Sequence, residues 1–110
     1  MKYLITESQL EKVIFKYLDN QDFIQIDKDK SIYFVNSEGD EYAQIRYLKD
    51  SGSCVIYIEL INEISSFFSL ELTDSMDVIG RWVEDTLQVM VTNSNNVYEW
   101  DEWELRISSN

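Results

Sequence analysis

Four short apolar runs in the first half of the chain constrain the fold most strongly, because only a few residues separate each from the next. The runs are FIQID (23–27), SIYFVN (31–36), EYAQIRYL (41–48) and CVIYIEL (54–60). Apolar and polar residues alternate along most of them, as is typical of β-strands. Parallel neighbours need a crossover of a dozen or more residues, so the short links predict an antiparallel meander.

Alternation along these runs predicts which side chains face the core. The predicted set is Ile24, Ile26, Ala43, Ile45, Tyr47, Cys54, Ile56, Ile58 and Leu60. The run 31–36 is open to either orientation, because Ile32 with Phe34 and Tyr33 with Val35 are both apolar pairs. A sheet that is partly covered on its second face would account for this.

The stretch ITESQL near the N-terminus is typical of a helix start. Thr6 and Gln9 have the spacing of a capping box, and Ile5 and Leu10 have the spacing of a hydrophobic staple. Apolar residues then recur at steps of three and four, which predicts a helix over 7–19.

After residue 60 the apolar period changes to that of helices. We expect a short helical piece at 61–68 and a longer helix capped by Thr73 or Asp74, ending near 87–89. The predicted buried face of the longer helix comprises Met76, Ile79, Val83 and Leu87, with Trp82 beside it.

The C-terminal part is expected to return to strands. A short strand in LQVMV, a turn at TNSNN and a terminal strand in VYEWDEWELRI, bulged at Asp101–Glu102, are predicted. With 110 residues, the chain has the length of one domain. The predicted fold class is therefore a single α+β domain over 1–110, an antiparallel β-meander of about five or six strands packed against two main helices.

The charge balance is strongly acidic, with 21 acids, 9 bases and a formal net charge of −12. This surplus disfavours direct nucleic-acid binding, which needs cations for the phosphates, and contact with an anionic membrane. It favours a basic protein surface as the partner, for which a nucleic-acid-binding protein is one candidate. No apolar run approaches the ~20 residues of a membrane span. With only one cysteine, the expected location is the reducing cytoplasm.

Most catalytic chemistries lack their usual residues. The chain has no histidine, and its one cysteine, Cys54, is expected to be a buried core thiol. The acidic stretches at 27–29 and 38–41 do not match a calcium-binding loop and are interpreted as solvated turns. We therefore predict no catalytic residue, no metal site and no cofactor.

Two acidic groups are candidate partner-binding residues. The first combines acids with an aromatic anchor and comprises Glu99, Trp100, Asp101, Glu102 and Glu104. The second lies on the longer helix and comprises Asp74, Asp77, Glu84 and Asp85. The alternatives are a terminal edge strand with Trp103 in the core for the first group, and a solvated helix face for the second.

Three stretches, ITESQLEKVI, SSFFSLE and VIGRWVEDTLQVMVTN, resemble a group of small bacteriophage proteins without an assigned activity. The resemblance covers separate patches amounting to about half of the chain. It implies a phage origin, a location in the host cytoplasm and a host nucleic-acid-binding protein as the candidate basic partner. It supplies no catalytic residue.

Three functional hypotheses follow. The first is a non-enzymatic acidic binding protein that engages a basic protein surface. One version of it is an anti-defence inhibitor that occupies a nucleic-acid channel in place of phosphates. The second is a structural or assembly protein that acts as a homo-oligomer. The third is an enzyme that uses carboxylates and a divalent metal.

Overall fold

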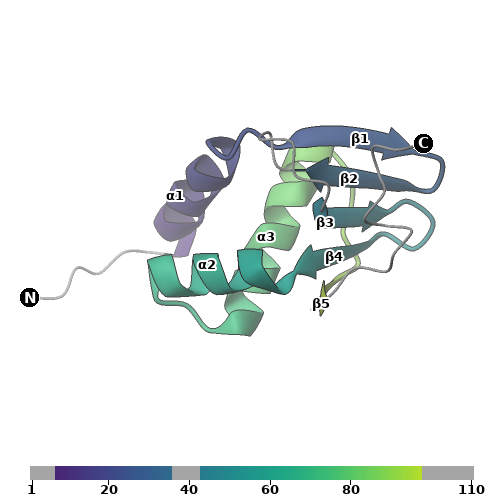
Figure 1. The fold of residues 1–110 in the computed structure, drawn as a ribbon. Coiled ribbons are helices and arrows are strands. Elements are labelled where there is room, and N and C mark those ends of the chain that lie inside the picture. Colours follow the sequence, from purple (N-terminus) through teal and green to yellow (C-terminus); the bar gives the residue numbers. More distant parts are fainter. Residues whose placement is uncertain (1–6, 36–42, 98–110) are drawn as a thin grey trace, which may run out of the picture.

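A computed structural model describes residues 7–35 and 43–97 of the chain. The elements are α1 (Glu7–Asp19), β1 (Ile24–Lys28), β2 (Ser31–Val35), β3 (Ala43–Leu48), β4 (Ser53–Tyr57), α2 (Ile58–Phe68), α3 (Leu72–Leu87) and β5 (Asn93–Val97). The three helices gather at one side of the sheet (Figure 1). The predicted α+β class and the predicted first helix are both confirmed.

The sheet has five strands in the order β1-β2-β3-β4-β5. The pairings from β1 through β4 are antiparallel, which confirms the predicted meander. Strand β5 instead pairs parallel to β4. A parallel neighbour needs a long crossover, and α2 and α3 together supply it.

Each face of the sheet carries an apolar cluster. The main cluster lies against the helices and includes Phe34, Ile45, Tyr47, Cys54 and Ile56 from the strands. A smaller cluster on the opposite face includes Tyr33, Val35 and Ala43, with Ile26, Val55, Tyr57 and Val97 partly buried around it. Tyr33, Phe34 and Val35 are buried and Ile32 is partly buried, so side chains of the second strand are removed from solvent on both faces of the sheet.

Three residues predicted to face the main core lie elsewhere. Ile24 and Ile26 pair with Val35 and Tyr33, so they share the opposite face with them. Ile24 is 50% exposed, because β1 is at the margin of the five-stranded sheet. Ala43 is buried but on the opposite face, because the register with β2 shifts between Phe34 and Val35.

The prediction of a strand over 54–60 is wrong in its last three residues. Strand β4 ends at Tyr57, and Ile58 begins α2, so the predicted helical piece starts earlier than expected. Leu60, Ile61 and Ile64 are the buried residues of α2. Residues three or four positions apart, as Ile64 is from Ile61 and from Leu60, lie on the same face of a helix. Ile58 and Leu60 thus join the core from a helix.

Helix α3 differs from its prediction at the N-terminus. The N-cap is Glu71, without a side-chain capping bond, so neither Thr73 nor Asp74 caps the helix. Its last residue, Leu87, lies within the predicted range. Trp82, expected beside the apolar face, is buried in the core.

The region after α3 was predicted incorrectly. No strand forms at 87–91, and the expected turn TNSNN supplies most of β5. The side chains of β5 are mostly polar, so the strand forms because its backbone pairs with β4. The predicted terminal strand beyond Val97 lies outside the described residues.

The Cys54 thiol is buried in the main cluster, as predicted. Burial raises the pKa of this thiol to about 12, because the apolar surroundings disfavour the thiolate. Within the described ranges, no helix has the length and hydropathy of a membrane span.

Candidate functional site

The outward face of α3 is the strongest candidate site in the part of the chain that the structure describes. The buried residues of the helix are Ser75, Val78, Ile79, Gly80, Trp82 and Val83. At 3.6 residues per turn, the predicted acids Asp74, Asp77, Glu84 and Asp85 lie within about 100° of arc on the other side. We call these four residues the acidic face of α3. Arg81, the one base of the helix, lies among them.

Glu84 differs from the other three acids because it has a structural role. Its Oε2 accepts a hydrogen bond of 2.9 Å from the backbone N–H of Val91. This bond holds the segment that leads from α3 into β5. Asp74, Asp77 and Asp85 are exposed, whereas Glu84 is half-buried.

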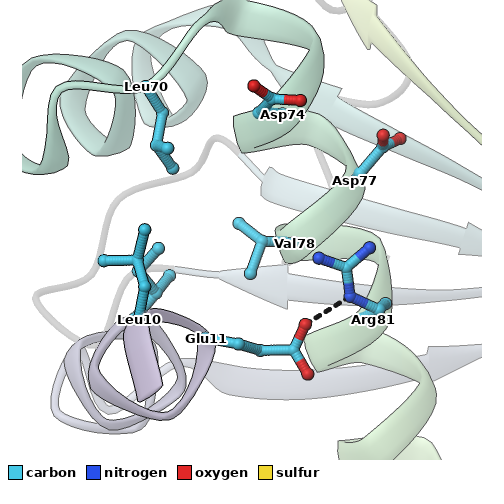
Figure 2. Close-up of a pocket in the computed structure, with 8 residues that line it drawn as sticks. Leu10, Glu11, Leu70, Asp74, Asp77, Val78 and Arg81 are labelled. Carbon is cyan, nitrogen blue, oxygen red and sulfur yellow. Dashed lines mark hydrogen bonds and ion pairs between the residues drawn. The ribbon is translucent and has the colours of Figure 1, made fainter. Parts of the chain in front are cut away.

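A hollow of about 210 Å³ lies between α1 and α3, beside this acidic face. Figure 2 shows Leu10, Leu70 and Val78 directed toward one another across it. Ile14 completes the apolar lining. The polar lining residues are Glu11, Asp74, Asp77 and Arg81.

The rim of the hollow is negatively charged. Arg81 donates from Nε to Glu11 Oε1, and the pair links α3 to α1 (Figure 2). Among the described residues, Asp74 and Asp77 have neither a hydrogen bond nor an ion pair from their carboxylates. The rim thus holds three carboxylates and one guanidinium, a net charge of −2 from 1 − 3.

The other predicted acidic group is not placed. Glu99, Trp100, Asp101, Glu102 and Glu104 lie outside the described residues, so their part in binding stays a prediction.

The acidic turns show no metal site in the described ranges. Asp27 forms an ion pair of 2.5 Å with Lys49. No group of three potential ligands occurs in 7–35 and 43–97. The stretch 38–41 is outside these ranges.

The hollow itself was not predicted from the sequence. Helical periodicity marked Leu10 and Ile14 as apolar positions, but nothing marked Leu70 in the connection between α2 and α3. The Glu11–Arg81 pair joins residues 70 positions apart. Its only sequence signal is that Arg81 is the single base in an acidic helix.

An aromatic cluster lies at the contact of α1 with α2. The Tyr17 ring stacks on Phe67, with centroids 5.2 Å apart, and meets Phe68 edge-on. The Tyr17 hydroxyl donates a hydrogen bond to Glu63 Oε2. Burial, followed by the hydrogen bond and charge of Glu63, raises the pKa of Tyr17 to about 12.

Tyr17 is therefore expected to ionise at a higher pH than an ordinary tyrosine, whose pKa is 10.0. The fold favours the neutral phenol, so its contribution to stability is complete below pH 10 and is lost as the pH rises toward about 12. Ultraviolet titration of tyrosinate should show that Tyr17→Phe removes a group with a midpoint near 12. Glu63→Gln should lower that midpoint. If the tyrosine lost from the titration of Tyr17→Phe has a midpoint near 10 instead, the assignment is contradicted.

Comparison of the chain with protein-family models, curated proteins and solved structures finds no match. The function is therefore inferred from the chemistry of the site.

Proposed function

We propose that the protein is a non-enzymatic binding protein whose acidic α3 face contacts a basic surface on another protein. The observation that supports this most directly is the alignment of four acids with a single base on one helix face. Asp74 and Asp77 are exposed, so their carboxylates can be reached by cations of a partner. The net charge of −12 favours encounter with such a surface.

The charge density of α3 can be compared with that of DNA, which tests the hypothesis that the protein mimics nucleic acid. From Asp74 to Asp85 the helix rises about 17 Å at 1.5 Å per residue. Duplex DNA carries about ten charges over that length. The helix offers four acids, so this face suits a small basic patch better than a complete duplex channel. A phosphate-mimicking anti-defence inhibitor would also need the acids of residues 98–104.

The alternative functions have less support. For a homo-oligomer, the shared charge of −12 opposes association of two copies through acidic faces. For a metal-dependent enzyme, no described cluster offers three ligands. The phage origin and host partner implied by the sequence resemblance are compatible with the proposed binding function.

The proposal is tested by removing charge from α3 alone. The variant Asp74→Asn/Asp77→Asn/Asp85→Asn keeps Glu84 and its structural bond. Each exposed pair contributes about 0.2–1 kcal/mol, so partner affinity should fall about tenfold at low salt. Proteins captured from bacterial lysate by the wild type should be basic, and rising salt should release them.

The matched control is Asp22→Asn/Asp29→Asn/Asp50→Asn, which changes the net charge equally at exposed residues outside α3. This control should capture the same proteins as the wild type. Equal losses of captured proteins by both variants would show that only the total charge matters. The proposal would be contradicted if the α3 variant captured the same proteins as the wild type, or if rising salt did not release them.

A further inference from the structure

We infer that the hollow between α1 and α3 receives an apolar side chain of the partner, flanked by lysine or arginine residues that pair with Asp74 and Asp77. This inference rests on the proposed function and specifies the chemistry of the partner. It adds an apolar anchor to a contact that would otherwise be purely electrostatic.

The lining of the hollow provides the apolar part of the contact. Ile14 and Val78 are almost fully buried, and they form the base of the hollow within the main core. Leu10 and Leu70 are only partly buried and converge on the opening (Figure 2). An inserted apolar side chain would remove surface of these two leucines from water, which is favourable in proportion to the area covered.

The size of the hollow favours a side chain over a small molecule. Small-molecule pockets usually enclose about 300–1,000 Å³, whereas this hollow encloses about 210 Å³. A single apolar side chain is an appropriate occupant for such a space.

The charge of the rim favours a basic segment over a second copy of this chain. Arg81 is paired with Glu11, and the exposed carboxylates of Asp74 and Asp77 lie beside the opening without a cationic partner among the described residues. Protein interfaces commonly combine a central anchor in a pocket with a polar rim. A second copy would bring another net charge of −12 to this rim.

Two short synthetic peptides provide the test. The first has one leucine between two pairs of lysines, and the second has serine in place of the leucine. Calorimetry at low salt should show about tenfold tighter binding of the leucine peptide, since burying a leucine accounts for a difference of that order. In NMR spectra of the full chain, the leucine peptide alone should shift the methyl signals of Leu10, Leu70 and Val78.

Variants of the full chain separate the apolar and charged contributions. Leu70→Ser should reduce binding of the leucine peptide to the level of the serine peptide. Leu72→Ser is the matched control, because Leu72 is 45% exposed and does not line the hollow. Asp74→Asn/Asp77→Asn should weaken both peptides. Circular dichroism verifies that each variant folds. If Leu70→Ser does not fold, the methyl shifts of the wild-type chain still test the inference.

The outcomes distinguish this inference from the proposed function. Equal affinity of the two peptides, with no methyl shifts in the hollow, would overturn the inference and leave the acidic face as a basic-partner site. If neither peptide binds at low salt, both the inference and the proposed function are contradicted. Concentration-dependent dimerisation that Leu70→Ser abolishes would identify a second copy as the occupant and overturn the inference.

Discussion

Replacing Trp82 with alanine is expected to lower the free energy of unfolding by about 3–5 kcal/mol. The side chain is only 4% exposed, and its ring lies 5.1 Å from that of Phe34 and 5.9 Å from that of Phe23, between centroids. Its Nε1 donates a 2.9 Å hydrogen bond to Asp19 Oδ1 at the end of α1. The substitution would leave a cavity where α1, α3 and the sheet meet. Urea unfolding followed by circular dichroism measures the loss.

Two control substitutions make this prediction specific. Trp82→Phe keeps an aromatic ring but loses the bond to Asp19, which is exposed and regains water, so the cost should be about 1–2 kcal/mol. Met90→Ala removes a side chain that is 75% exposed and should change stability by less than about 0.5 kcal/mol. A cost for Trp82→Ala as small as that for Met90→Ala would contradict the described packing.

Local signals in the sequence predicted several elements correctly. Helix α1 has apolar residues at helical spacing, and the meander from β1 to β4 has links too short for parallel neighbours. These elements depend on residues close together in the chain. Ile45, Tyr47, Cys54 and Ile56 face the main core as predicted, because alternation continues without a register shift from Ile45 along β3 and throughout β4.

The incorrect predictions depend on tertiary pairing. The sequence NSNNV lacks apolar alternation, and its strand forms through parallel backbone bonds to β4. The register shift beside Ala43 arises between two strands and leaves no signal in either one. At Ile58, alternating and helical periods overlap in IYIEL, and packing against α3 favours the helix.

The candidate site was predictable only in part. Helical spacing was sufficient to place Asp74, Asp77, Glu84 and Asp85 on one side of α3. The hollow beside them requires α1 to lie against α3, and the Glu11–Arg81 pair shows how far apart the contributing residues are in the chain. Such a contact cannot be derived from one sequence without knowing how the helices pack.

Replacing Gly52 with alanine is expected to destabilise the protein by about 2–6 kcal/mol. Gly52 has a φ of 78°, which side chains rarely adopt, and enforcing it costs about 1–3 kcal/mol. An added Cβ would also lie 3.0 Å from Thr92 Cγ2 and 3.2 Å from the Met90 carbonyl oxygen. Crowding of this kind costs about 1–3 kcal/mol. Urea unfolding with circular dichroism provides the measurement.

The second variant, Gly52→Ala with Thr92→Ser, separates crowding from backbone strain. Serine lacks the Cγ2 atom but retains a hydroxyl for the bond that Thr92 Oγ1 donates to the Ser51 carbonyl oxygen. The double variant should therefore recover part of the lost stability, while the strain at Gly52 remains. The Gly52 carbonyl oxygen accepts a 2.8 Å bond from the Thr92 N–H, so this turn also sets where β5 begins beside β4. At a negative φ, Gly→Ala would stabilise the protein by about 0.4–1 kcal/mol, and such a result would refute the described turn.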